Sequence, residues 1–362
     1  MVRIPSNIQD LVSYKPGKPV AQIVDELNLK EWAVLWNNEN NLGPAPKALV
    51  EIQRAMSDAH LYPDPSAGRL CSLIAEANQC TPDHVTVDNG SESVFDCMLR
   101  AFFEPGDELL TCEGTFVAVY IWAKANNVHC ERIALAADFK FDIDQLIAGV
   151  GPKTKAIYVA NPNNPTGAMI GKDDLSRLVR SVPSHVIIIV DEAYFEYAQI
   201  LSDDYPDSFQ MRRPNVVSLR TFSKAYGIAG IRVGYALGPP HLIAAIRKVR
   251  MTFAPSQLSQ AAAIGALHDH EHVQKTIELN RKALSEFYSG LDRAGLRYVP
   301  SFGNFVMVDL GTEDEAKAFA EKMLTKGVFV RHLRAFGLAH CVRISTGTQS
   351  ENDLFVRAIS SI

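Results

Sequence analysis

A run of four consecutive apolar residues, Ile187-Ile188-Ile189-Val190, constrains the fold of this chain more than any other segment. A strand with one solvated face alternates apolar and polar residues, whereas a strand that is apolar at every position is covered on both faces. Such strands are typical of mainly parallel sheets that lie between layers of helices. We therefore expect residues 186–190 to form a strand of an α/β domain that is covered on both faces.

The region from about residue 40 to residue 237 alternates short apolar segments with stretches of helical periodicity. Its other predicted strands are residues 84–88, 108–112, 128–133, 156–160, 216–219 and 233–237. Its predicted helices include residues 93–103, 116–125 and 175–181. In open sheets of this kind, ligands bind beyond the carboxyl ends of the strands. Polar residues that directly follow these strands are therefore candidates for function.

After Pro239 the predicted helices become longer, and they are followed by a second group of strands. The helices are expected at residues 241–249, 258–267 and 271–294. The strands are expected at residues 304–310, 328–330 and 341–345, with a helix near residues 315–325. This βαβ-like pattern predicts a smaller α+β domain. Because 362 residues are too many for one compact core, we divide the chain into an N-terminal arm (1–39), a large domain (40–250) and a small C-terminal domain (251–362).

Composition excludes several classes of function. A hydrophobic content of 47% with 21% charged residues is ordinary for a globular protein. A net charge of −5 gives no sign of a nucleic-acid-binding surface. The six cysteines are scattered without a CxxC pair, which indicates buried thiols in a reducing compartment. With no signal peptide and no apolar run long enough to cross a bilayer, we expect a cytoplasmic enzyme without nucleic-acid or membrane partners.

Lys224 follows the predicted strand at residues 216–219 through a short linker. A lysine in a loop at a strand end can leave solvent, lose its proton and act as an amine nucleophile. Ser223, Arg232 and nearby glycines suit the binding of a phosphate. Together these residues predict a lysine that forms a Schiff base with a phosphorylated aldehyde, pyridoxal 5′-phosphate. The alternative for this residue taken alone is a solvated surface charge.

Three other strand ends carry polar residues. Asn89-Gly90-Ser91-Glu92 follows strand 84–88 and opens a helix, where free N–H groups attract a phosphate or where Ser91 is an ordinary N-cap. The loop Asn161-Pro162-Asn163-Asn164-Pro165-Thr166-Gly167 is rigid enough to hold an amide side chain against a ring oxygen. Asp191, directly after the buried strand, can pair with a pyridinium nitrogen. Its alternative interpretation is a helix N-cap.

The combination of Asn164, Asp191, Tyr194, Lys224 and Arg232 resembles the fold-type I pyridoxal-phosphate aminotransferases of classes I and II. The resemblance covers essentially the whole chain. Within that superfamily the sequence most resembles the histidinol-phosphate aminotransferases. The matching segments are Tyr14-Lys15-Pro16-Gly17-Lys18-Pro19, Asn38-Glu39-Asn40 with Leu42-Gly43-Pro44, Tyr62-Pro63-Asp64, Arg331, and Arg343 in Val342-Arg343-Ile344-Ser345-Thr346-Gly347-Thr348.

The resemblance implies a role for each matching residue. Lys224 would form the Schiff base and move the proton between the substrate and the cofactor. Asp191 would contact the ring nitrogen, while Asn164 and Tyr194 would hold the phenolic oxygen. Phe116, where the family usually has tyrosine, would stack on the ring. The implied phosphate ligands are Ser91, Glu92, Thr221 or Ser223, Arg232 and the partner subunit's Tyr62. The implied substrate-binding residues are Tyr14, Asn164, Arg331 and Arg343.

The implied protein is a homodimer with shared active sites, whose N-terminal arm packs against the small domain and the partner. The implied reaction is ping-pong transamination between histidinol phosphate and 2-oxoglutarate in histidine biosynthesis. Three alternatives stay open: an aromatic amino acid aminotransferase, an amino-acid-phosphate decarboxylase of the same fold, and a ligand-sensing regulator. The regulator would need an attached DNA-binding domain, for which the residues before Tyr14 leave no room.

The segment His268-Asp269-His270-Glu271-His272 is rich in metal-binding residue types. On a helix, however, only His268 and His272 lie on the same face. The segment also falls between two predicted helices. We therefore interpret it as a solvated junction and predict no metal site.

Overall fold

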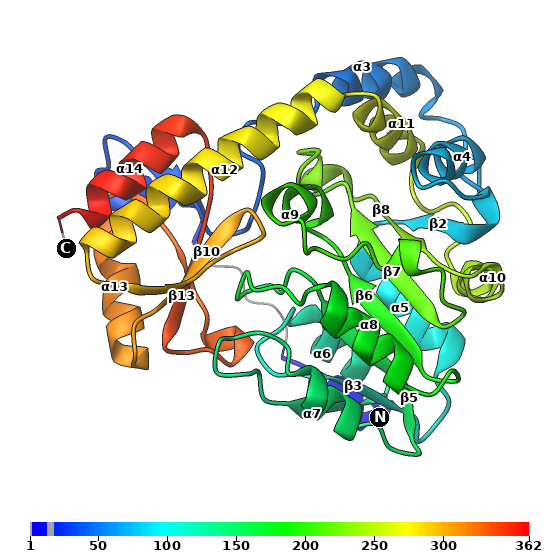
Figure 1. The fold of residues 1–362 in the computed structure, drawn as a ribbon. Coiled ribbons are helices and arrows are strands. Elements are labelled where there is room, and N and C mark those ends of the chain that lie inside the picture. Colours follow the sequence, from blue (N-terminus) through cyan, green and yellow to red (C-terminus); the bar gives the residue numbers. More distant parts are fainter. Residues whose placement is uncertain (1, 13–17, 362) are drawn as a thin grey trace.

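The computed structural model describes residues 2–12 and 18–361. Its large sheet has seven strands in the order β2-β8-β7-β6-β5-β3-β4 (Figure 1). Neighbouring strands run parallel except β8, which is antiparallel to both β2 and β7. The strands are β2 (Val85–Asp88), β3 (Glu108–Cys112), β4 (His129–Ile133), β5 (Thr154–Ala160), β6 (Ile187–Asp191), β7 (Val216–Thr221) and β8 (Gly234–Leu237). The predicted mainly parallel sheet is confirmed.

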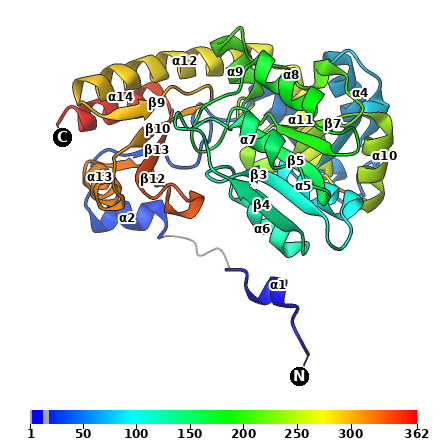
Figure 2. The same cartoon turned by 60° about the horizontal axis from the view of Figure 1, so that its bottom comes forward.

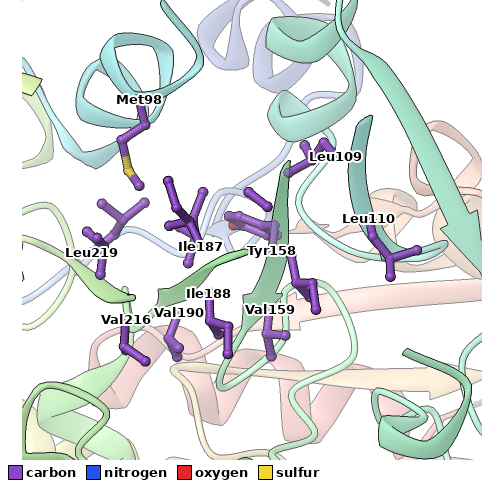
Figure 3. Packing of buried hydrophobic residues seen from close by; sticks show 14 of the residues in the cluster. Met98, Leu109, Leu110, Tyr158, Val159, Ile187, Ile188, Val190, Val216 and Leu219 are labelled. Carbon is purple, nitrogen blue, oxygen red and sulfur yellow. The ribbon is translucent and has the colours of Figure 1, made fainter. Parts of the chain in front are cut away.

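Strand β6 lies at the centre of this sheet, and all its residues are buried. Because side chains alternate along a strand, Ile187 points to the same side as Met98 of the helix above it, while Ile188 and Val190 point to the opposite side (Figure 3). Both faces are therefore covered, which explains why the run is apolar at every position. Tyr158 of β5 points to the Ile187 side, a direction that matters for the site described below.

Two layers of helices cover the faces of this sheet (Figure 1). Helices α5 (Ser91–Phe102), α6 (Ala118–Ala125) and α10 (Pro240–Val249) pack together in one layer, and α7 (Ile143–Ala148) and α8 (Lys172–Ser181) pack together in the other. Helix α9 (Phe195–Leu201) follows β6. The predicted helices 93–103, 116–125, 175–181 and 241–249 are confirmed within three residues at each end, and α7 and α9 were not predicted.

A second hydrophobic core lies against the edge strands β2 and β8. It is formed by α3 (Pro46–Ala55), α4 (Gly68–Ala77) and α11 (Gln257–Leu267), of which only α11 was predicted. Buried residues of α11 share this core with residues of β2 and β8. The packing therefore joins α11 to the large sheet, although it lies within the residues 251–362 assigned to the small domain. The division of the chain at residues 39 and 250 stays a prediction.

The remaining strands form a four-stranded antiparallel sheet in the order β12-β13-β10-β9. They are β9 (Arg297–Val299), β10 (Phe305–Asp309), β12 (Arg331–His332) and β13 (Cys341–Ser345), and helices α12 (His270–Arg293), α13 (Glu313–Thr325) and α14 (Gln349–Ile359) lie alongside them. Since β10 and β12 are both antiparallel to β13, they run in the same direction. A βαβ arrangement is thus present, but its second strand is β12 rather than the predicted strand at residues 328–330, which is β11 (Val328–Phe329) in a separate two-stranded sheet.

The N-terminal segments contact both parts of the molecule. Strand β1 (Ala33–Val34) pairs with β11 (Val328–Phe329), while the Asn7 side chain of α1 (Ser6–Gln9) donates hydrogen bonds to backbone carbonyls at the end of α6. Helix α2 (Val20–Glu26) lies beside α13 (Figure 2). The short 3-10 turns are η1 (Met56–Asp58), η2 (Pro82–His84), η3 (Phe209–Met211), η4 (Ala229–Ile231) and η5 (Arg334–Phe336).

The histidine-rich segment is the predicted junction, since α11 ends at Leu267 and α12 begins at His270. The expectation that it is solvated is wrong for Asp269 and His272, which are both buried. Asp269 accepts a hydrogen bond from the Lys47 backbone and so ties the junction to α3. All six cysteines are free thiols. No helix within residues 2–12 and 18–361 is long and apolar enough to span a bilayer.

Candidate active site

A cavity of about 240 Å³ opens at the carboxyl ends of the central strands, beside the first turn of α5. Ten of the eleven residues predicted to bind a cofactor line this cavity, which therefore gathers side chains from four separate strand ends. They are Ser91, Glu92, Phe116, Asn164, Asp191, Tyr194, Thr221, Ser223, Lys224 and Arg232. The exception is Tyr62.

Lys224 extends from the linker after β7 into this cavity. Its Nζ donates a hydrogen bond to the backbone oxygen of Asn38 at 3.1 Å and lies 5.7 Å from the centroid of the Tyr194 ring. Burial lowers the pKa of Lys224 to about 8, and the positive charges of Arg343 and Arg232 act in the same direction. The amine therefore loses its proton far more readily than an exposed lysine, as a nucleophilic amine requires.

Asp191 lies at the end of β6 and is 8% exposed. Its Oδ2 accepts a hydrogen bond from the Tyr158 hydroxyl at 2.7 Å, and its Oδ1 accepts one from the Ala193 backbone N–H at 3.1 Å. Burial raises the pKa of Asp191, and these two hydrogen bonds oppose the rise. Asp191 does not cap α9, whose N-cap is Tyr194. A buried carboxylate held in this way favours a cationic partner inside the cavity.

At one end of the cavity, the backbone around Gly90 lies very close to Arg232 and to Gly234. Gly90 has φ +95°, and a Cβ there would lie 2.8 Å from Arg232 Nη2. A Cβ on Gly234 would lie only 2.3 Å from the Ser91 backbone nitrogen. Gly90 is the N-cap of α5, so the interpretation of Ser91 as an N-cap is wrong, and no described side chain caps this helix. Its first N–H groups are free to bind an anion.

Hydroxyl groups and a guanidinium face the same end of the cavity. The Thr221 hydroxyl donates a hydrogen bond to Ser223 Oγ at 3.0 Å, and Arg232 Nη1 lies 3.4 Å from the same oxygen. A helix N-terminus, two hydroxyls and an arginine form a donor set that suits a phosphate group.

Polar groups from distant segments line the opposite wall. The Tyr194 hydroxyl accepts a hydrogen bond from Asn38 Nδ2 at 2.8 Å, and burial raises the pKa of Tyr194 to about 12. Asn164 Oδ1 accepts a hydrogen bond from Arg343 Nη1. Phe116, just before α6, adds an apolar surface. This wall therefore presents a phenol and an amide to any ring held between Phe116 and the strand ends.

Arg343 and Arg331 face each other across the antiparallel pair of β13 and β12. Arg343 is 4% exposed, and its Nη2 donates a hydrogen bond to the Trp36 backbone oxygen at 2.7 Å. Its Nε has no partner among the described residues. Burial lowers the pKa of Arg343 to about 10, and the neighbouring charge of Arg331 adds to the effect. Neither arginine lines the cavity directly, but Arg343 contacts its wall through Asn164.

Tyr62, the remaining predicted cofactor ligand, also lies outside this cavity. Tyr62 is 80% exposed and stacks on Phe253, with 4.3 Å between the ring centroids. Its predicted role was in the site of a partner subunit, and that role stays a prediction. Tyr14 lies outside the residues that the structure describes.

Several residues of the site were not identified from the sequence. Tyr158 binds Asp191, Asn38 binds Tyr194, and Asn37 and Glu39 line the cavity. A signal was present for Tyr158, because it carries the only side-chain hydroxyl in the otherwise apolar segment 156–160. Asn38 lies in the segment Asn38-Glu39-Asn40 that carries the family resemblance, but its contact with Tyr194 arises only through the tertiary fold.

The donor set of the cavity fits a phosphorylated pyridine aldehyde. Such a molecule needs an amine for its aldehyde, an anion for its ring nitrogen and several donors for its phosphate. Lys224 supplies the amine and Asp191 the anion. The end of the cavity that contains Ser91 and Arg232 supplies the donors for the phosphate. Asp191, a buried carboxylate with no ion pair among the described residues, and the helix start at Gly90 both fit this cofactor, pyridoxal 5′-phosphate.

Comparison with known proteins gives the same class. Residues 30–359 match the family model described as "Aminotransferase class I and II". The chain is 36% identical over 359 residues to histidinol-phosphate aminotransferase 2 of Pseudomonas fluorescens, covering 98% of this chain and 96% of the relative. It is 37% identical to histidinol-phosphate aminotransferase 2 of Methylococcus capsulatus, with 98% of this chain and 96% of the relative covered.

A solved structure supports this result at the level of the fold. The crystal structure of histidinol-phosphate aminotransferase from Sinorhizobium meliloti in complex with pyridoxal-5′-phosphate superposes with a TM-score of 0.89 and 29% identity, covering 100% of this chain and 97% of that chain. The fold and the lysine-containing cavity define an aminotransferase of fold type I. The chain belongs to the class I and II aminotransferases and, within them, to the histidinol-phosphate aminotransferase family.

Proposed function

We propose that this protein transfers the amino group of histidinol phosphate to 2-oxoglutarate, in histidine biosynthesis, with pyridoxal 5′-phosphate as cofactor. The observation that carries this proposal is the shared cavity of Lys224, Asp191 and Arg232. When bound, the cofactor supplies an electron sink for the substrate carbon that bears the amino group. Glutamate and 2-oxoglutarate would alternate in this cavity with the second substrate pair, as a ping-pong cycle requires.

The residues of the cavity have separate tasks in this reaction. Lys224, with its lowered pKa, is both the attachment point for the cofactor and the base that moves a proton at the substrate carbon. Asp191 stabilises a protonated ring nitrogen, and its buried position strengthens that interaction. Asn164 and Tyr194 orient the ring through its phenolic oxygen, while Phe116 covers one face.

The phosphate of the cofactor fits the end of the cavity that is rich in hydrogen-bond donors. The first N–H groups of α5, at Ser91 and Glu92, supply two donors, because no described side chain caps them. Thr221, Ser223 and Arg232 supply the remaining donors. A partner subunit's tyrosine at position 62 would complete the set.

Arg331 and Arg343 are suited to the common end of the two substrates. A guanidinium is a planar fork that pairs in a bidentate manner with either a carboxylate or a phosphate. The phosphate of histidinol phosphate can therefore occupy the place of a glutamate carboxylate. The unpartnered Nε of Arg343 is a donor available for this purpose. Tyr14 is proposed for the same wall on the resemblance alone.

We also propose a homodimer in which Tyr62 enters the site of the other subunit. Tyr62 and Phe253 are exposed although they stack on each other. Other large apolar side chains of the same two chain segments, residues 49–62 and 251–253, are exposed as well, and exposed apolar surface favours a partner. They are Leu49, Val50, Met56, Leu61 and Met251. A cytoplasmic location agrees with six free thiols.

A panel of substrates tests the proposed reaction. With 2-oxoglutarate as acceptor, kcat/KM should be higher for histidinol phosphate than for phenylalanine or tyrosine. Release of CO₂ is measured in the same assays, because the alternative of a decarboxylase predicts it. A higher kcat/KM for phenylalanine would assign the chain to aromatic amino acids, and CO₂ release without amino transfer would contradict transamination.

A further inference from the structure

A second cavity, of about 610 Å³, lies between α4, α9 and the start of α12. Its walls include Ile74, Tyr235 and Val273 on the apolar side, and Glu196 and Arg220 on the polar side. Exposed Gln199 and Gln274 lie at its rim. None of the residues assigned to the cofactor or the substrate lines it.

At the ends of two strands, consecutive side chains point toward different cavities. At the end of β6, Asp191 faces the cofactor cavity, while the next residue, Glu192, bonds to Arg220. At the end of β7, Thr221 faces the cofactor cavity, while Arg220 lines the second one. Because neighbouring side chains of a strand point to opposite faces, the two cavities lie on opposite sides of the central sheet.

Glu196 is a buried carboxyl group, 6% exposed, and it faces the second cavity. No described lysine, arginine or histidine nitrogen lies within 4 Å of it, whereas Glu192 and Asp207 are both paired with Arg220. Burial raises the pKa of Glu196 to about 7, opposed by its own backbone N–H, Arg220 and the Tyr226 hydroxyl. A buried carboxylate without an ion pair is unfavourable, so a cation that enters beside it stabilises the ionised form against the protonated one.

The charge of Arg220 is already compensated by two other carboxylates, so it does not supply that cation. Nε donates to Glu192 at 2.8 Å, Nη1 to Asn78 at 2.9 Å and Nη2 to Asp207 at 2.8 Å. Its guanidinium also lies 3.4 Å from the centroid of the Phe195 ring. Two carboxylates thus surround one guanidinium, and the negative charge of Glu196 has no ion-pair partner among the described residues.

Aromatic rings add a second feature that favours a cation. Phe195, Tyr226 and Tyr235 line the cavity together with Glu196. The faces of aromatic rings attract cations, and rings combined with a carboxylate form the cages that hold quaternary ammonium groups. Because the Phe195 ring is already covered by Arg220, we propose that the second cavity is a binding site for a small organic ammonium ion, held by Glu196 and the rings of Tyr226 and Tyr235. The site is separate from the proposed active site.

Choline is a suitable probe, because its permanent charge does not titrate and it has no primary amine to react with the cofactor. Its neutral isostere, 3,3-dimethylbutan-1-ol, is the matched control ligand. Isothermal titration calorimetry on the cofactor-saturated protein at pH 8 should give saturable choline binding. Binding of the isostere should be about tenfold weaker or more. Equal affinity for the two ligands, or no saturable choline binding, would overturn the proposal.

Two variants locate the bound choline. Glu196→Gln keeps the shape of the side chain and removes its charge, so choline affinity should fall about tenfold or more. Gln274→Trp changes an exposed residue at the rim, so the fold is retained while the bulkier side chain obstructs the cavity and abolishes binding. Lys224→Ala should leave choline affinity unchanged. Binding lost in Lys224→Ala but kept in both other variants would place choline in the cofactor cavity and refute the second site.

The pH dependence of binding provides an independent check. Above about pH 7 Glu196 is ionised, so choline affinity in the wild type should rise between pH 6 and pH 8. The other titratable or charged groups on the wall are Glu76, Arg220, His268, His270 and the two tyrosines. The Glu196→Gln variant retains all of them, so its smaller slope isolates the contribution of Glu196. Identical slopes in the two proteins would contradict the assignment.

Discussion

The Tyr158 hydroxyl donates a hydrogen bond to Asp191 Oδ2 at 2.7 Å, and both side chains are buried. Tyr158 is on β5 and Asp191 on the adjacent, parallel β6, so this bond holds the carboxylate from the neighbouring strand. A hydrogen bond to a charged group is stronger than one between neutral groups. Tyr158 therefore fixes the orientation of Asp191 and favours its ionised form against the effect of burial.

Replacing Tyr158 by phenylalanine removes this donor and should lower kcat about tenfold. The pKa of Asp191 would rise further, so the acid limb of the kcat–pH profile should move to higher pH. Tyr288→Phe is the matched control, because the Tyr288 hydroxyl accepts a hydrogen bond from the Ser301 backbone at 2.8 Å in the small domain. An unchanged profile for Tyr158→Phe would mean that the hydroxyl serves packing alone.

Asp191→Asn should lower kcat by a factor on the order of 10² or more. The amide keeps the size of the side chain but cannot stabilise a protonated ring nitrogen. Cofactor content is measured by absorbance in the same samples, so that loss of binding is separated from loss of turnover. Near-normal turnover would assign Asp191 a structural role only.

The reactivity of Lys224 should depend on pH with a midpoint near 8. Below that pH the amine is protonated and cannot attack an aldehyde, whereas above it the amine is free. The rate of pyridoxal phosphate uptake by cofactor-free enzyme, followed by absorbance, should therefore rise about tenfold per pH unit below 8 and then level off. Arg343→Gln removes a neighbouring positive charge, so the midpoint should move to higher pH. Lys224→Ala provides the blank.

Arg331→Ala should reduce kcat/KM for histidinol phosphate more than for phenylalanine. The missing charged hydrogen-bond partner should cost about 2–3 kcal/mol in transition-state binding. Arg334→Ala is a control, because Arg334 lies nearby in sequence but is exposed and pairs with Glu313 at 3.3 Å. Equal losses for both substrates would show that Arg331 does not distinguish the phosphate from a carboxylate.

Mixed dimers test the proposed position of Tyr62. Lys224→Ala subunits and Tyr62→Phe subunits are each impaired in every homodimer. If one site takes these two residues from different chains, a hybrid dimer contains one fully native site and recovers activity on mixing. Subunit exchange is verified by native mass spectrometry. Exchange without recovery would place Tyr62 outside the site of the other subunit.

The sequence was most informative where a residue is specified by its place at a strand end. The β6 run predicted a strand covered on both faces, and the polar residues after four strands, together with the family resemblance, predicted ten lining residues of one cavity. The α/β fold followed from the same pattern. These predictions succeed because parallel strands bring their carboxyl ends to one edge of the sheet, so chain position alone gives the approximate position in space.

The sequence was less informative where a residue acts through a distant contact. The bond from Asn38 to Tyr194 joins segments 156 residues apart. The burial of Asp269 and His272 depends on α3 packing beside the junction. Helices α3, α4 and α14 were missed although each has a buried side. Each of these features depends on a contact with a residue that is distant in sequence, and local periodicity does not predict such contacts.

Two consecutive carboxylates lie at the end of strand β6. Asp191 faces the cavity that contains Lys224, whereas Glu192 accepts a hydrogen bond from Arg220. A deletion or insertion of one residue within positions 187–190 would exchange them, because it reverses which face each side chain meets. Each site would then receive a carboxylate on a side chain of the wrong length, Glu192 in the cofactor cavity and Asp191 beside Arg220. Residues 187–192 should accordingly tolerate changes of side chain far better than any change of length.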